Sequence, residues 1–178
     1  VLKLWEGVGY YSRARNLHRA AQLVCEQYGG TLPADYEALL ALPGVGEYTA
    51  GAVASIGFGL CVPAVDGNVM RVAARLNDDF TPITDAKQKK RTTGHFSEIT
   101  PEDRPGDFNQ SLMELGATVC LPNGAPRCGS CPVQHLCLGY HHGHAEILPV
   151  RAAKRARRIE ERTVLLVRCG EEVGICRR

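Results

Sequence analysis

Apolar residues recur at helical spacing through most of the first 138 residues. One stripe includes Leu17, Ala21 and Val24, and another includes Leu112 and Leu115. Apolar positions three or four residues apart lie on one face of a helix, so this spacing predicts amphipathic helices. Short breaks rich in glycine and proline separate them at residues 28–30, 42–44, 57–59, 66–67 and 101–106. We therefore expect an all-α fold.

The pattern changes after Cys137. Residues 139–161 are largely polar and basic without a coherent apolar face, which is typical of an interdomain linker. From residue 162 onward, β-branched and apolar residues over 163–167 indicate a strand. A single strand cannot satisfy its own backbone groups. We therefore interpret 162–178 as the truncated start of a further domain, and Val1 as a second truncation inside a helical domain.

Composition and charge exclude some classes of protein. Hydrophobic residues make up 44% of the 178 residues, which is enough for a packed core. No apolar run approaches the roughly 20 residues of a membrane-spanning helix, so we expect a cytosolic protein. The net charge is +2, but residues 151–162 hold six of the 21 basic and two of the 19 acidic residues. The rest is slightly acidic, so charge alone is no evidence of nucleic-acid binding.

A Gly-Val-Gly turn lies between two predicted helices, in the sequence LPGVGEYTAGAVASI over residues 42–56. Gly44 and Gly46 can adopt backbone angles forbidden to other residues, and they let a phosphate approach the N–H groups at a helix start. The segment, with Leu42 and Val45, thus predicts a sequence-independent DNA clamp. The glycines could equally serve only the corner between two helices.

Asp66 follows this turn, 18 residues after Tyr48. Taken alone, Asp66-Gly67-Asn68 predicts a turn in which the aspartate caps a helix.

Four of the eight cysteines fall within 18 residues as C-x7-C-x2-C-x5-C; they are Cys120, Cys128, Cys131 and Cys137. Disulfides are disfavoured in the cytosol. Zinc sites usually pair two C-x2-C knuckles, and this segment has one. Four thiolates suit a [4Fe–4S] cluster, although the spacing is not that of ferredoxins.

These motifs together resemble those of MutY-type adenine DNA glycosylases in the endonuclease III superfamily. The residues 42–46 resemble its helix-hairpin-helix, and GVGYYSRARNL over 7–17 resembles the segment that inserts a tyrosine beside 8-oxoguanine. FNQSLMELG over 108–116 resembles the helix before the cluster. The cysteine motif resembles the family's C-x6-C-x2-C-x5-C with one residue more in the first gap. The resemblance covers residues 1–138.

The resemblance implies a helix-hairpin-helix glycosylase fold with an iron–sulfur cluster loop. It assigns residues 1–60 to part of a six-helix module, and 61–138 to the [4Fe–4S] cluster domain with the catalytic aspartate. Residues 139–161 would be the basic linker, and 162–178 the start of a Nudix-like domain.

It also implies removal of adenine mispaired with 8-oxoguanine or guanine in double-stranded DNA, by a monomer of the bacterial cytoplasm associated with the nucleoid. Asp66 would stabilise positive charge on the sugar, and Tyr48 and Asn68 match residues that hydrogen-bond around it. Bifunctional relatives carry lysine where Tyr48 stands, and a phenol cannot form a Schiff base. Tyr10 would wedge into the base stack, and Val8 would lie beside the lesion.

Two alternatives stay open, an endonuclease III-type pyrimidine glycosylase and a non-catalytic iron–sulfur DNA-binding fragment. MutY-type enzymes carry a catalytic glutamate on an earlier helix, which protonates the adenine. Glu6 is not at a matching position, so we expect this chain alone to be inactive. A further cluster, His141, His142 and His144, suggests metal binding, but we interpret it as an exposed loop.

Overall fold

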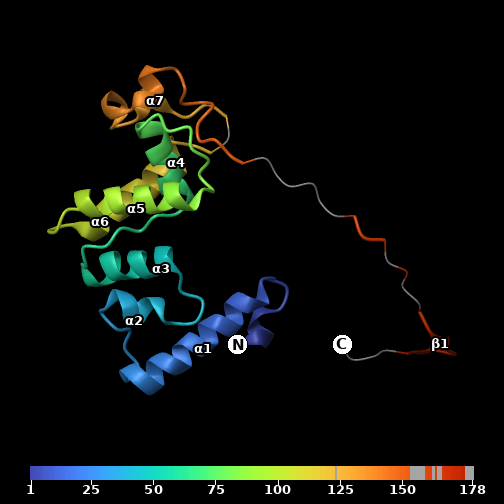
Figure 1. Ribbon diagram of the computed structural model, residues 1–178. Helices are drawn as coiled ribbons and strands as arrows, with labels where there is room; N and C mark the ends of the chain where they lie inside the picture. Colours follow the sequence, from blue (N-terminus) through green and yellow to red (C-terminus); the bar gives the residue numbers. More distant parts are fainter. Residues whose placement is uncertain (123, 153–158, 162, 164–165, 175–178) are drawn as a thin grey trace.

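The structure is a computed structural model that describes residues 1–178 except 123, 153–158, 162, 164–165 and 175–178. Its body is helical, which confirms the predicted fold class up to residue 138 (Figure 1). The first elements are the 3-10 helix η1 (Leu2–Trp5), α1 (Tyr11–Tyr28), α2 (Tyr36–Leu40), α3 (Glu47–Ala52) and the π-helical turn η2 (Val53–Gly57). No helix among the described residues is long and apolar enough to cross a membrane.

The second part of the body begins after an extended connection. It comprises α4 (Gly67–Leu76), α5 (Ala86–Ile99), α6 (Pro105–Glu114), the π-helical turn η3 (Leu115–Val119), the 3-10 helices η4 (Cys128–Ser130) and η5 (Gln134–Leu136), and α7 (Leu138–His141).

Aspartates start three of these helices. The side chains of Asp35, Asp66 and Asp85 accept hydrogen bonds from backbone N–H groups in the first turns of α2, α4 and α5. Such caps satisfy donors that have no partner inside the helix. Helix α1 ends before Gly29, which takes the left-handed conformation that commonly follows the last residue of a helix.

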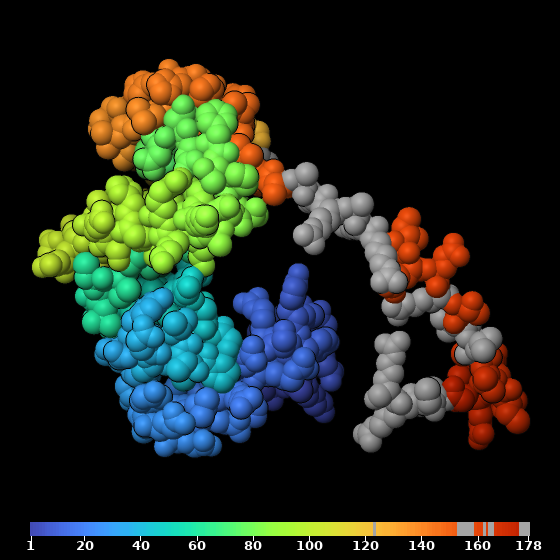
Figure 2. Space-filling model, in the orientation of Figure 1, coloured from blue at the N-terminus to red at the C-terminus, as the bar shows by residue number. Residues whose placement is uncertain are grey.

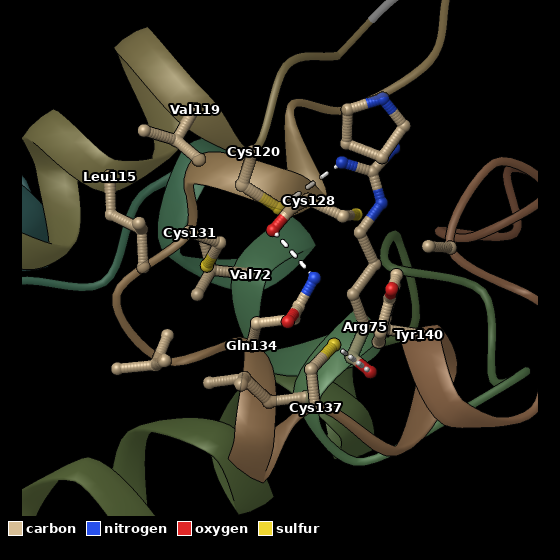
Figure 3. Close-up of a pocket in the computed structure, with 14 residues that line it drawn as sticks. Val72, Arg75, Leu115, Val119, Cys120, Cys128, Cys131, Gln134, Cys137 and Tyr140 are labelled. Carbon is tan, nitrogen blue, oxygen red and sulfur yellow. Dashed lines mark hydrogen bonds between the residues drawn. The ribbon is translucent and has the colours of Figure 1, made fainter.

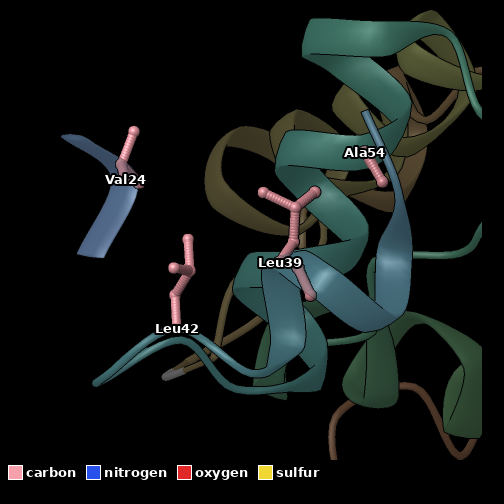
Figure 4. Close-up of a cluster of buried hydrophobic side chains, with 5 residues drawn as sticks. Val24, Leu39, Leu42 and Ala54 are labelled. Atoms are coloured by element: carbon pink, nitrogen blue, oxygen red, sulfur yellow. The ribbon is translucent and has the colours of Figure 1, made fainter. Parts of the chain in front are cut away.

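Aliphatic side chains from α1 to η2 form the first core; they are Val24, Leu39, Leu42, Ala50 and Ala54 (Figure 4). Leu42 is only 6% exposed. The turn thus points the Leu42 side chain into the core, so the predicted contact of Leu42 with DNA stays a prediction that only its backbone could meet.

A second core forms around α4; its buried members are Val65, Val69, Met70, Ala73 and Phe96. Phe108 and Leu112 of α6 pack against it.

Asn109 of α6 joins the two parts of the body. Its Oδ1 accepts from Ala64 N at 2.9 Å, and its Nδ2 donates to Ser55 Oγ and to Val62 O, each at 2.9 Å. The amide is buried and satisfied on both sides, as buried polar groups must be. It therefore fixes α6 against η2 and against the strand-like connection before Asp66.

The predicted linker begins too early. Residues 138–150 pack on α4: Leu148 is 1% exposed, and its carbonyl accepts from Arg75 Nε at 2.9 Å. A Cβ on Gly139 would lie 2.6 Å from Arg75 O, so α7 sits directly on the α4 backbone. Val150 O accepts from Ile83 N at 3.1 Å. Ala145 and Leu148 are therefore core residues, and a linker can start only after Val150.

The carboxyl-terminal strands differ from the prediction. Strand β1 (Arg168–Cys169) pairs antiparallel with β2 (Glu172–Val173), and the left-handed Gly170 lies in the turn between them. The described residues of 163–167 form no strand, although Val167 O accepts from Gly174 N at 2.9 Å. The expectation of a strand without a partner was therefore wrong, because the turn lets the chain pair with itself.

Candidate functional site

The α2–α3 hairpin is closed by a tight turn. Val45 N donates to Leu42 O at 3.1 Å, and Gly44 has φ +80°. A Cβ at Gly44 would lie 2.7 Å from the Cβ of Asn16 on α1. This position therefore requires glycine for two reasons, its left-handed backbone and the close approach of α1.

Gly46 does not have the unusual backbone angles that the sequence predicted for both glycines of the turn. Its φ is −102° and ψ 174°, an extended conformation open to any residue. A Cβ there would meet nothing within 4 Å. Glycine leaves open space beside the start of α3, where the first N–H groups of a helix lack intrahelical partners. An anion can approach these donors from outside.

The sequence predicted that Asp66 caps a helix, and the structure confirms this cap. Its Oδ1 accepts from Asn68 N and Val69 N, each at 2.8 Å, which makes it the cap of α4. Its Oδ2 accepts from Asn68 Nδ2 at 2.9 Å. The half-buried carboxylate is thus held by three donors while part of it stays open to solvent.

Arg71 connects this carboxylate to the segment before the cysteines. Its Nη2 donates to Asn68 Oδ1 at 3.1 Å and to Gly116 O at 2.7 Å, and its Nε donates to Cys120 O at 2.8 Å. Burial lowers the pKa of Arg71 from its ordinary value, while the nearby Cys120 and Asp66 act in the opposite direction. One buried guanidinium therefore orients Asn68 and also fixes η3.

Tyr48 does not reach Asp66 in this structure. Its hydroxyl is 3.6 Å from Met113 Sδ on α6, so the predicted hydrogen bond around the carboxylate is absent from the described contacts. The ring lines an open pocket with Val65, the residue before Asp66, and with Lys89 and Lys90 of α5. Tyr48 is therefore close to the site without contacting its carboxylate.

Tyr10 and Val8 lie on an exposed loop before α1. Tyr10 is 80% exposed and Val8 64% exposed, so neither is a core residue. Trp5 Nε1 donates to Gly9 O at 2.9 Å and braces the loop. Tyr10 has φ +46°, a left-handed conformation uncommon for a bulky side chain. Figure 2 shows the amino-terminal segment facing the part that carries α4 and α5 across a hollow.

The four predicted cysteine ligands line one pocket (Figure 3). Arg75 Nη1 donates to Cys120 Sγ at 3.1 Å, and Cys137 Sγ lies 3.4 Å from Arg75 O. Gln134 Nε2 donates to Cys128 O at 3.0 Å. Apolar side chains complete the wall; they include Val72, Leu115, Val119 and Val133.

The surroundings of the pocket raise the pKa of two of the four thiols. Burial raises the pKa of Cys128, and the neighbouring sulfurs raise it further. Burial also raises the pKa of Cys137. No three of these four sulfurs lie within 4.8 Å of one another. One tetrahedral zinc ion would hold its sulfurs roughly 3.8 Å apart, closer together than any three of these four sulfurs lie.

Sequence reasoning missed the two buried arginines, Arg71 and Arg75, which are 4% and 3% exposed. Arginine is rarely fully buried, so a single sequence predicts it on the surface. The available signal was their four-residue spacing on α4, which places both on one helix face beside Met70 and Val72.

The hairpin and the helical arrangement define a helix-hairpin-helix protein with an endonuclease III-like fold. The helix-hairpin-helix motif family matches residues 27–56. The structure of a thermostable thymine-DNA glycosylase matches with a TM-score of 0.64 at 34% identity, covering 73% of this chain and 59% of that chain. A non-covalent endonuclease III–DNA complex matches with a TM-score of 0.63 at 31% identity, covering 77% and 61%.

The relatives found by sequence point to one kind of DNA glycosylase more narrowly than the solved structures do. The chain is 46% identical over 155 residues to the adenine DNA glycosylase of Mus musculus, covering 85% of this chain and 30% of that protein. It is 48% identical over 138 residues to the adenine DNA glycosylase of Homo sapiens, covering 77% and 25%. The chain is thus a homologue of adenine DNA glycosylases, which confirms the predicted resemblance, and it spans less than a third of either relative.

Proposed function

We propose that this chain is the part of an adenine DNA glycosylase that grips DNA and carries the catalytic carboxylate. The substrate would be adenine mispaired with 8-oxoguanine or guanine, released by hydrolysis of its N-glycosidic bond. The observation that carries this proposal is the Asp66–Asn68 pair at the start of α4, directly after the helix-hairpin-helix. Homology to adenine DNA glycosylases supports the choice of base.

Asp66 supplies negative charge where the reaction builds positive charge. Breaking the glycosidic bond leaves an oxocarbenium-like sugar, which a fixed carboxylate stabilises. Three hydrogen bonds hold the carboxylate in place, so it need not reorganise during the reaction. Tyr48 stands where bifunctional relatives have lysine. A phenol forms no Schiff base, so we infer hydrolysis without strand cleavage.

The grip on DNA has two parts in this proposal. The open space at Gly46 lets a backbone phosphate reach the start of α3, with Gly44 and Val45 shaping the turn. The exposed Tyr10 ring is free to stack in the space left by the flipped adenine, and Val8 lies two residues before it.

Cys120, Cys128, Cys131 and Cys137 would together hold a [4Fe–4S] cluster. The donor set is four thiols in an apolar pocket, and the sulfurs are too far apart for one zinc ion. The cluster would supply a rigid cross-link between η3, η4 and the start of α7. Purified protein should contain iron and inorganic sulfide, and stoichiometric zinc without sulfide would contradict this assignment.

Residues 162–178 would begin a Nudix-like domain. The short β1–β2 hairpin after an all-helical body supports a change of fold class there. A two-stranded hairpin alone is marginal in water, so it needs further packing.

An excision assay tests the proposed activity. The chain would replace the matching region of the mouse adenine DNA glycosylase, and the chimera would be offered duplexes with adenine opposite 8-oxoguanine. We expect adenine release, with strand breaks only after alkali. Asp66→Asn should slow release by at least about a hundredfold and spare DNA binding, since it removes charge and little contact surface.

Asp107→Asn is the matched control, because it makes the same chemical change at an exposed residue paired with Arg104. Excision of a pyrimidine, or a borohydride-trapped adduct, would instead support the endonuclease III-type alternative. DNA binding without release of any base would support a non-catalytic fragment.

A further inference from the structure

Three ligand-type side chains meet at the carboxyl-terminal end of α4. Asp78 lies just after α4, while His142 and His144 follow α7. His142 Nδ1 lies 2.7 Å from Asp78 Oδ2, and His144 Nδ1 lies 3.0 Å from Asp78 Oδ1. Within the part of the chain that the structure describes, this is the one group of three Asp, Glu, His or Cys residues whose ligand atoms all lie within 4.8 Å.

The backbone holds this group from both sides. Gly143 has φ +76°, and His144 N donates to Gly139 O at 2.7 Å, which turns the two imidazoles toward one carboxylate. Asp78 has φ +53°, an uncommon conformation that persists where surrounding contacts enforce it and that recurs at ligand sites. The Phe80 ring packs edge-on against His144 with centroids 5.1 Å apart.

Two imidazole nitrogens and a carboxylate oxygen are a common ligand set for zinc and similar ions. Bonds of about 2.0–2.2 Å in tetrahedral geometry would put the ligand atoms roughly 3.3 Å apart. One carboxylate oxygen, Asp78 Oδ2, lies 2.7 Å from His142 Nδ1 and 3.1 Å from His144 Nδ1, so these two distances need to open by only a few tenths of an ångström. The Asp78 side chain is 14% exposed, while those of His142 and His144 are 54% and 38% exposed. Water can therefore complete the coordination.

We propose that Asp78, His142 and His144 bind one divalent transition-metal ion, with Zn²⁺ as the probe. The ion would tie the segment after the cysteines to the end of α4. Asp66 lies at the opposite end of this ten-residue helix, about 15 Å away along its axis. The site is therefore structural, separate from the cysteine pocket, and independent of the proposed glycosylase function.

Zinc binding by the full chain tests this proposal. Protein freed of loosely bound metal by a mild chelator would be titrated with Zn²⁺, and zinc, iron and sulfide would be counted at each step. We expect one zinc ion per chain, taken up with iron and sulfide unchanged. Removing a direct ligand should cost more than the 10–100-fold seen for outer-shell partners, so His142→Ala should weaken uptake at least about a hundredfold.

His141→Ala is the matched control, because His141 precedes the group and its ring nitrogen contacts His135 O instead. Asp78→Asn is the second variant, since asparagine accepts the left-handed backbone at this position. Co²⁺ would identify the ligands, because nitrogen and oxygen ligation gives a visible spectrum without thiolate-to-cobalt charge transfer.

Equal zinc uptake by wild type, His142→Ala and Asp78→Asn would overturn the proposal, as would no uptake by wild type. Zinc gained only as iron is lost would place the ion in the cysteine pocket and would also overturn it. An unaltered circular dichroism spectrum for the exposed His142→Ala variant would show that lost binding is not lost folding.

Discussion

Both halves of the body bury five apolar residues, but the cysteine half, residues 63–150, also buries two arginines among backbone carbonyls, and the amino-terminal half, residues 11–62, buries no charged side chain among its described residues. Among the buried polar residues described, only Ser55 lies in the amino-terminal half. The arginine partners in the cysteine half include Gly116 O, Cys120 O and Leu148 O. Apolar burial is non-directional and tolerates small shifts. The arginine hydrogen bonds form only while η3 and the cysteine loop stay in place, because their acceptors are carbonyls of those segments. The difference teaches that η3 and the cysteine loop, unlike the two apolar cores, depend on whatever holds the cysteines.

The largest expected effect is that of replacing one cysteine of the pocket. If the four cysteines hold the proposed [4Fe–4S] cluster, Cys128→Ser should release its iron and unfold the cysteine loop, because metal binding and folding of such a site are coupled. Hydrogen exchange should then show lost protection in η3 and α7 but retained protection in α1 and α3. Cys25→Ser is the control, since Cys25 is exposed on α1 and outside the pocket. Equal loss of protection in α1 would break the comparison.

Truncating a core residue of the amino-terminal half should lower the stability of the protein without changing its iron content. Leu39 is 1% exposed at the centre of that core, so Leu39→Ala should cost about 2–5 kcal/mol of unfolding free energy. Iron and sulfide content of the folded protein should not change. Leu17→Ala, at a largely exposed residue of α1, should stay within about 0.5 kcal/mol. Iron loss in Leu39→Ala would show that the two halves do not differ in this way.

Arg71→Met sharpens the comparison within the cysteine half. Methionine fills similar space but leaves the carbonyls of Gly116 and Cys120 unpaired, each at a cost of about 1–3 kcal/mol. Denaturant unfolding followed at the iron chromophore should report this loss. Arg71→Lys, which keeps the charge but not the three-way geometry, should restore only part of it. A melting curve identical to wild type would show that these hydrogen bonds contribute no net stability.

The smallest effect on stability is expected at the hairpin. Gly46→Ala meets open space with an ordinary φ, so unfolding should change by less than about 0.5 kcal/mol while DNA affinity falls. Gly44→Ala is the contrast, because its left-handed backbone and the Asn16 contact should cost roughly 1 kcal/mol or more. Unchanged DNA affinity in Gly46→Ala would remove this position from the proposed clamp.

Several residues show how far sequence reasoning could go. The cap at Asp66 followed from local chemistry and its Asn68 partner from the family resemblance, and both are present. The sequence could not show whether the Leu42 side chain points into the core or toward solvent, because the direction of a leucine in a turn depends on what packs behind it. The same holds for residues 139–150, where Leu148 and Ala145 are too sparse to show helical spacing and yet are buried.

By itself, the sequence determined the helical body, the hairpin turn, the capping aspartate and the four cysteines as a group, because each depends on spacing within a few residues. Only the tertiary structure decided that Arg71 and Arg75 lie inside, that Asn109 joins the two halves, and that Asp78 meets two histidines more than 60 residues away. These contacts join distant segments, and no local pattern encodes which buried carbonyl or carboxylate a polar side chain will find.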